Sequence, residues 1–111
     1  MTDKIIVFVT CESDEQADQI AETLVVEKLA ACVNVVPGIR SCYVWKGELN
    51  WSDEVLLLVK TTRGRFGQMQ ERILAMHSYE VPEIVGVTIE DAFQKYLDWI
   101  DTNIGGAKND N

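Results

Sequence analysis

Basic residues are scarce in this chain, which limits the partners that it can have. Its 111 residues include 18 acidic and 10 basic side chains, for a formal net charge of −8 at pH 7. Binding to nucleic-acid phosphates requires Lys and Arg in clusters, and here only Arg63 and Arg65 lie close together. We therefore expect no nucleic-acid partner.

Long hydrophobic runs are also missing. No apolar run approaches the roughly 18 residues that a membrane-spanning helix needs. At the N-terminus, Thr2-Asp3-Lys4 leads directly into a strand pattern and does not resemble a signal peptide. The sequence therefore predicts a cytoplasmic protein with no membrane partner.

Residues that often mark catalytic or metal sites are few. The three cysteines, Cys11, Cys32 and Cys42, are an odd number without a CxxC pair, so neither a disulfide framework nor a zinc knuckle is indicated. There is one histidine, His77, and no GxSxG, HExxH or glycine-rich phosphate loop. We expect reduced thiols, no required cofactor and no enzymatic activity.

The most prominent feature that is present is a long β-hairpin over residues 31–61. Both arms are rich in β-branched and aromatic residues, with Lys46-Gly47 as the turn between them. Gly47 can adopt the positive φ that a tight hairpin turn requires. Trp45 and Trp51 flank this turn, and we expect them to meet across the ladder, directly or diagonally.

The hairpin arms are too long for a small domain to cover. Each arm would extend roughly 40 Å, since a strand rises about 3.3 Å per residue. Pro37-Gly38 interrupts the first arm, and because proline removes a ladder donor, this arm should be an edge strand with a bulge. An edge of this length favours pairing with another chain.

Apolar spacing predicts the remaining elements. A strand is expected over 5–9, followed by a helix over 14–29 that Ser13 and Gln16 begin as a capping box. A second helix, capped by Thr61 or Thr62, should extend to His77. A strand over 84–89 and a last helix complete the order. We expect Asp91 to cap this last helix and Gly105-Gly106 to end it. Its buried stripe should consist of Phe93, Tyr96, Leu97 and Ile100.

This order, βαββαβ with an extra C-terminal helix, predicts an α+β fold of the ferredoxin-like type, with an antiparallel sheet and the first two helices on one face. We expect a single domain over residues 1–104 and a disordered tail over 105–111. The strands at 5–9 and 55–59 are apolar on both faces. Copies of the same chain are the simplest way to cover the second face.

Five ordered motifs then make a family resemblance recognisable. They are Lys28-Leu29-Ala30-Ala31-Cys32-Val33-Asn34, Tyr43-Val44-Trp45-Lys46-Gly47-Glu48, Lys60-Thr61, His77-Ser78-Tyr79-Glu80-Val81-Pro82-Glu83 and Tyr96-Leu97-Asp98-Trp99. Over about residues 5–101 the chain closely resembles the CutA divalent-cation-tolerance family. The resemblance implies a ferredoxin-like homotrimer, cytoplasmic in bacteria, that is linked to heavy-metal tolerance and binds copper.

The resemblance also implies which residues hold the metal. Family copper binding is associated with a cysteine at the end of the first strand and a histidine at the end of the second helix, which match Cys11 and His77. Met76 stands where some relatives have histidine, and Ser78 stands where the family usually has proline. Met and Cys together would suit Cu(I), since both are soft ligands.

The order of elements independently brings Cys11 and His77 together. In a split βαβ fold the first strand and the second helix end at the same side, where Glu12, Glu80, Glu83 and the hairpin tip also lie. Two interpretations stay open at this point. The pair can ligate a metal, or Cys11 is a small residue ending a buried strand while His77 caps the helix.

A second class of function is a small-molecule signalling module. Trimers of similar architecture, the P-II nitrogen-signalling proteins, bind nucleotides between subunits. Arg63-Gly64-Arg65 at the start of the second helix could receive an anion there, or the two arginines are simply solvated.

Overall fold

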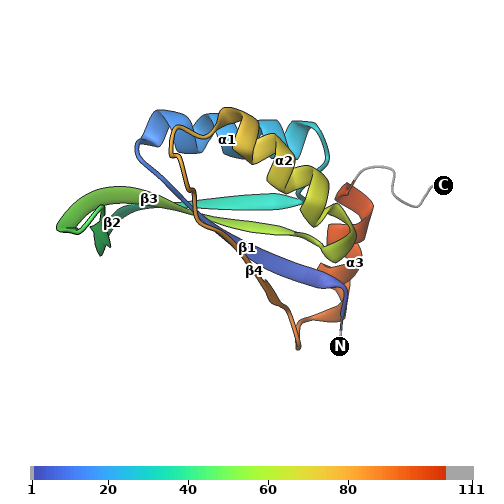
Figure 1. Cartoon of the computed structure of the whole chain (residues 1–111). Coiled ribbons are helices and arrows are strands. Elements are labelled where there is room, and N and C mark those ends of the chain that lie inside the picture. Colours follow the sequence, from blue (N-terminus) through green and yellow to red (C-terminus); the bar gives the residue numbers. More distant parts are fainter. Residues whose placement is uncertain (1, 105–111) are drawn as a thin grey trace.

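The computed structural model describes residues 2–104 as a four-stranded antiparallel sheet with three α-helices (Figure 1). The elements are β1 (Lys4–Cys11), α1 (Asp14–Val26), β2 (Cys32–Trp45), β3 (Glu48–Thr62), a 3₁₀ turn (Arg63–Arg65), α2 (Phe66–Met76), β4 (Ile84–Thr88) and α3 (Gln94–Asn103). This is the predicted α+β order. The expected end of the last helix at Gly105-Gly106 and the expected tail over 105–111 lie outside the described residues.

The strands lie in the order β2-β3-β1-β4, so the first arm of the hairpin is an edge strand, as predicted. The β2–β3 register shifts between Val36 and Ile39, where Pro37-Gly38 forms the expected bulge. Gly38 has a φ of 79°, which a residue with a side chain rarely adopts. Beyond this bulge the hairpin extends past the body of the domain (Figure 1).

The hairpin turn has the geometry of a type I′ turn. Lys46 and Gly47 both have positive φ, 53° and 81°, and the flanking residues Trp45 and Glu48 pair with each other. Mirror-image turns of this kind match the twist of the strands that they connect. The positive φ predicted for Gly47 is therefore confirmed, and the turn determines the register of both arms.

That register shows that the predicted contact between Trp45 and Trp51 was wrong. Trp51 pairs with Cys42, three positions from Trp45, and an odd separation along a strand places side chains on opposite faces. Trp51 lies instead beneath the guanidinium of Arg40, 4.7 Å from the ring centroid. Nearness to the turn in sequence was not enough to predict the pairing.

Helix α1 begins as predicted and ends early. The Ser13 hydroxyl accepts a hydrogen bond from the Gln16 backbone N–H at 3.1 Å. The helix ends at Val26, three residues before the predicted end, because Lys28 adopts a left-handed φ of 60°. Bonds from Leu29 N to Leu24 O and from Lys28 N to Val25 O then form a Schellman motif.

The predicted caps of the other two helices were wrong. The Thr61 hydroxyl is buried and donates to the Leu29 carbonyl oxygen at 2.7 Å, while Thr62 begins the 3₁₀ turn without a side-chain cap bond. The N-cap of α3 is Phe93 and not Asp91, and it too makes no side-chain cap bond. For Thr61 the reason is clear, because its hydroxyl is already bonded to a distant carbonyl oxygen.

Helices α1 and α2 lie side by side on one face of the sheet and enclose the main core (Figure 1). Alternate strand residues point into this core: Ile5, Val7, Val9, Cys11, Val55, Leu57 and Val59. The Gly86 Cα also lies on this face, with the side chains of Ile5, Phe66 and Val7 around it. The predicted arrangement of two helices on one face is therefore correct.

Helix α3 packs at the end of the sheet, against a smaller cluster. Leu97 and Ile100 are buried with Ala31 and Ile104, and Lys4 donates to Asp101 at 2.8 Å. Phe93 and Tyr96, predicted on the buried stripe, are 73% and 37% exposed in the single chain. The reason is that α3 contacts only a short edge of the domain.

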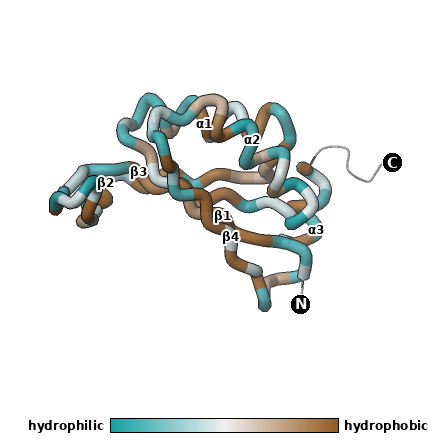
Figure 2. The backbone as a smooth tube through the Cα atoms, in the orientation of Figure 1, coloured by the Kyte–Doolittle hydropathy of each residue, from teal (hydrophilic) through white to brown (hydrophobic). Residues whose placement is uncertain are grey.

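The second face of the sheet is apolar, and among residues 2–104 helix α3 reaches only its end, where Lys4 bonds to Asp101. Phe8 pairs with Leu58 on one side and Val85 on the other, which makes an apolar row across three strands. Val85 and Val87 are 49% and 45% exposed, and Figure 2 shows that β1, β3 and β4 are largely hydrophobic. We call this surface, defined by Ile6, Phe8, Leu56, Leu58, Val85 and Val87, the open face.

Candidate functional site

The structure brings the three predicted copper ligands to one end of the sheet. Cys11 is the last residue of β1, Met76 is the last residue of α2, and His77 is the C-cap of that helix. The His77 Nε2 atom lies 2.8 Å from the carbonyl oxygen of Thr10. Met76 packs against the core cluster that includes Cys11. A thiol, a thioether and an imidazole therefore lie in the same region.

Cys11 is a fully buried thiol. Its relative exposure is 0%, and it points into the core beneath the helices. Burial, with a further contribution from the negative charge of Glu54, raises the pKa of Cys11 to about 11. The thiol is therefore protonated at neutral pH, and a ligand role requires a metal that displaces its proton.

Both ring nitrogens of His77 are engaged. Nδ1 accepts a hydrogen bond from the Tyr79 backbone N–H at 3.1 Å, so Nε2 carries the hydrogen and donates to the Thr10 carbonyl oxygen. The His77 backbone N–H also donates to Ile73 O at 2.8 Å, which fits the capping interpretation. A metal can take a nitrogen of His77 only after one of the two ring bonds breaks.

The loop after His77 is held by bonds to carboxylates. Ser78 donates from its hydroxyl to Glu12 at 2.9 Å, and Tyr79 donates from its phenol to Glu54 Oε2 at 2.6 Å. Burial first and the Glu54 interaction second raise the pKa of Tyr79. In the described range, 2–104, no three or more His, Cys, Asp or Glu side chains converge as a metal site would require. A harder cation therefore has no ready ligand set in this range.

A cleft of about 610 Å³ lies between this loop and the hairpin. It is lined by Thr10, Ser41, Cys42, Tyr43, Trp45, Glu54, Ser78, Tyr79, Glu80, Val81 and Glu83. Sequence reasoning placed Glu80, Glu83 and the hairpin tip at this end, and missed Glu54 and Tyr79. The one available signal was a glutamate directly before the apolar run 55–59.

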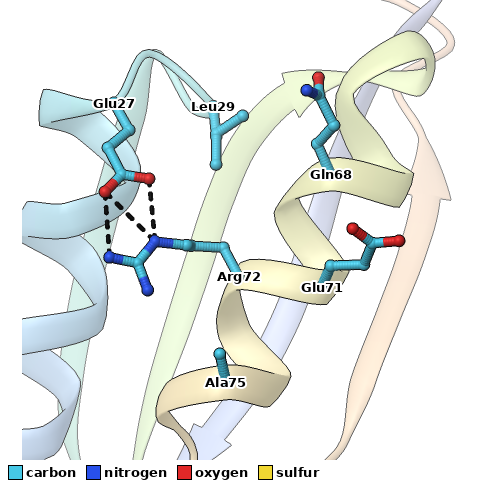
Figure 3. Close-up of a pocket in the computed structure, with 6 residues that line it drawn as sticks. All are labelled: Glu27, Leu29, Gln68, Glu71, Arg72 and Ala75. Atoms are coloured by element: carbon cyan, nitrogen blue, oxygen red, sulfur yellow. Dashed lines mark hydrogen bonds and ion pairs between the residues drawn. The ribbon is translucent and has the colours of Figure 1, made fainter.

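A second, smaller pocket of about 400 Å³ lies between the end of α1 and α2 (Figure 3). Glu27 and Arg72 face each other across it in a bidentate ion pair, with N–O distances of 3.0–3.2 Å. The Arg72 guanidinium lowers the pKa of Glu27. Because these two charges satisfy each other, this pocket offers less to a ligand than the larger cleft does.

The two arginines before α2 are bonded within the chain. Arg63 donates to the Thr88 hydroxyl at 3.0 Å, and Arg65 donates to Gln68 in the first turn of the same helix. Both side-chain bonds are exposed. Arg63 therefore fits the interpretation of a solvated arginine, whereas Arg65 is half-buried and its Nε atom is buried without a hydrogen-bond partner among the described residues.

Comparison with known proteins identifies the family of this chain. A family model described as CutA1 divalent ion tolerance protein matches residues 5–103. The chain belongs to the CutA1 family. A CutA1 relative, the divalent-cation tolerance protein CutA of Thermus thermophilus, is 50% identical over 100 residues, which make up 90% of this chain and 97% of the relative.

The solved structure of CutA1 from Thermus thermophilus has a TM-score of 0.90 and 49% identity, and the match covers 92% of this chain and 99% of that chain. A chloroplastic CutA protein of Arabidopsis thaliana is 42% identical over 96 residues, 86% of this chain and 53% of the relative. The solved structure of a periplasmic divalent cation tolerance protein CutA from Archaeoglobus fulgidus has a TM-score of 0.88 and 38% identity, and the match covers 90% of this chain and 97% of that chain. Relatives are thus named for more than one compartment, and the names of those from Thermus and Archaeoglobus describe cation tolerance and no reaction.

One observation bears on the membrane. Among the described residues of this CutA1 chain, no helix has the length and apolar character that crossing a bilayer requires.

Proposed function

We propose that this CutA1-family chain acts in the response to divalent and heavy-metal ions as a cytoplasmic homotrimer, and that it binds copper through Cys11, Met76 and His77. The observation that supports this most is the grouping of a thiol, a thioether and an imidazole at one end of the sheet. The proposed role is binding and not catalysis.

The chemistry of the three side chains favours Cu(I). Thiolate and thioether are soft ligands, which select Cu(I) over the harder divalent ions. Carboxylates do not converge into a competing site within residues 2–104. Copper in its reduced state is therefore the metal that this chain's residues fit best.

Binding at this site has two costs that the structure identifies. Cys11 must lose its proton, although burial raises its pKa to about 11. His77 must release either Thr10 O or Tyr79 N–H. Since one thiol proton leaves for each metal bound, the affinity should rise by about tenfold per pH unit below the pKa of Cys11.

The open face supports the trimer. An apolar sheet face is normally packed against another layer, and the row that Phe8, Leu58 and Val85 form lacks one in the single chain. The long edge strand β2 offers a further surface for pairing. Copies of this chain would cover both surfaces at once.

The thiols support a reducing compartment. Cys11, Cys32 and Cys42 are all free, and Cys42 is exposed. Exposed free thiols are typical of proteins in the cytosol. Cell fractionation with an antibody to the chain tests this assignment.

Competition for Cu(I) against a colorimetric chelator tests the copper proposal. Wild type would be compared with Cys11→Ser, Met76→Leu and His77→Ala, and with Cys42→Ser as the control, because Cys42 is an exposed thiol outside the proposed site. We expect weaker binding in the first three variants and wild-type binding in the control. Equal affinities in all five proteins would refute the proposed site. Loss of Cu(I) binding in Cys42→Ser alone would instead assign the site to the hairpin.

A further inference from the structure

The larger cleft carries negative charge without a positive partner. Three carboxylates line it, those of Glu54, Glu80 and Glu83, and no lysine or arginine does. The carboxylates do not converge as metal ligands within residues 2–104. A nucleotide does not fit, because its phosphates would be repelled by the same three groups.

Glu54 is the decisive residue. It is only 8% exposed, and it lines the cleft. Its Oε2 atom accepts the Tyr79 hydroxyl, whereas its Oε1 atom accepts no hydrogen bond and no Lys, Arg or His forms an ion pair with it among residues 2–104. A buried carboxylate usually pairs with a cation or has both oxygens hydrogen-bonded, because removing its charge from water is costly. In the single chain, one oxygen of Glu54 is therefore available to a partner from outside.

Two aromatic rings line the cleft on the same face of the hairpin as Glu54, because Tyr43 and Trp45 pair with residues 50 and 48, which lie an even number of positions from Glu54 along β3. Tyr43 and Trp45 lie on β2 and are 42% and 43% exposed. The hydroxyl of Tyr43 bonds to that of Ser52 at 2.7 Å, which restrains its ring. The Lys46 ammonium lies 5.9 Å from the Trp45 ring centroid, so this ring already contacts one cation of the chain.

We propose that this cleft binds a small organic cation, with an ammonium or amidinium group bonded to Glu54 Oε1 and an apolar part against Tyr43 and Trp45. The volume of about 610 Å³ lies within the range of small-molecule sites, roughly 300–1,000 Å³. Carboxylate and aromatic faces together are the usual means of recognising such cations.

This site is separate from the proposed copper ligands. Cys11 points into the core beneath α1 and α2, whereas Glu54 lines the cleft between the hairpin and the loop 78–83. Either site can therefore fail without the other. Cys11→Ser should leave binding of an organic cation unchanged, and this separates the two proposals experimentally.

Benzamidine is a suitable probe, because it combines an amidinium group with an aromatic ring. Titrations would follow the Trp45 indole N–H signal by NMR, assigned with Trp45→Phe, and would compare benzamidine with neutral benzyl alcohol and anionic benzoate. We expect millimolar affinity for benzamidine, as is typical of a fragment, and at least about tenfold weaker binding of the other two. Glu54→Gln should weaken benzamidine binding by about tenfold or more, since a charge-assisted bond is lost while the shape is kept.

Glu48→Gln is the matched control, because Glu48 is an exposed carboxylate on the same strand that does not line the cleft. It should bind benzamidine like wild type. The proposal is overturned if wild type does not bind benzamidine, if benzoate binds equally well, or if Glu54→Gln binds as wild type does. It is also overturned if Glu54→Gln weakens self-association while wild type binds no probe, because Glu54 would then pair with a basic side chain of a second copy.

Discussion

Leu58→Asp should abolish the proposed trimer. Leu58 lies on the open face, paired with Phe8 on β1 and Asn34 on β2, and it is only partly covered in the single chain. In a cyclic trimer the same side chain would be buried against another copy at three equivalent places. A charged group at this position would therefore affect every subunit contact at once.

The magnitude follows from two contributions. Burying a leucine side chain contributes about 1.5–3 kcal/mol, and this contribution is lost in each subunit. Removing an unpaired carboxylate from water costs several kcal/mol more in each subunit. The sum over three subunits exceeds about 10 kcal/mol, which is comparable to the binding free energy of a tight complex.

Sedimentation velocity at micromolar concentration provides the assay, with far-UV circular dichroism as the measure of folding. Leu57→Asp should lose the fold as well, because Leu57 is 0% exposed and points into the main core. Val26→Asp is the control and should remain trimeric, because Val26 is 78% exposed on α1. A Leu58→Asp protein that sediments as wild type would refute the assignment of the open face to assembly.

Three further predictions concern the subunit itself. Gly47→Ala should lower the free energy of unfolding by about 1 kcal/mol in urea denaturation, because Gly47 has a φ of 81°; unchanged stability would contradict the type I′ turn. Ser13→Ala should lower the free energy of unfolding by about 1 kcal/mol and Ser13→Asp by much less, since only the alanine lacks an acceptor for the Gln16 N–H. Equal losses in the two variants would show that the cap is not the cause. Stability should also fall between about pH 9 and pH 11, where the unfolded Cys11 thiol ionises while the folded thiol keeps its proton, and this thiol should contribute a loss of about 3 kcal/mol in total. The same denaturation series with Cys11→Ala should show a clearly smaller decline, restricted to pH values above about 10, where Tyr79, whose pKa burial also raises, begins to contribute. A decline of equal size from about pH 9 would assign it to other groups.

The order of elements could be predicted because it depends on local patterns. Continuous apolar runs marked the strands, spacing of 3.6 residues marked the helices, and Lys46-Gly47 marked the turn. The bulge at Pro37-Gly38 was predictable for the same reason, since proline cannot donate to the ladder. Each of these features is set by the residues that form it.

The errors occurred where tertiary contacts overrode local signals. Thr61 could not cap a helix because its hydroxyl bonds to Leu29, which lies 32 residues away. Helix α1 ended early because Lys28 adopted a left-handed conformation that the sequence does not mark, since lysine rarely does so. The Trp45–Trp51 pairing depended on an exact register, which a shift of one residue reverses.

Only part of the candidate site was visible in the sequence. The topology correctly placed Cys11 and His77 at the same end of the sheet. It could not show that both ring nitrogens of His77 are bonded, or that Glu54 is buried with one oxygen available. Those properties depend on the path of the loop 78–83, and loop paths are set by contacts between distant residues.

Copper K-edge X-ray absorption of the protein loaded with one equivalent of Cu(I) would identify the atoms that bind the metal. We predict a copper ion bound by two sulfur ligands and one imidazole nitrogen, from Cys11, Met76 and His77. One sulfur should be lost in Met76→Leu, and the nitrogen should be lost in His77→Ala. A spectrum with only oxygen and nitrogen ligands, or one unchanged by both substitutions, would contradict copper binding at this end of the sheet.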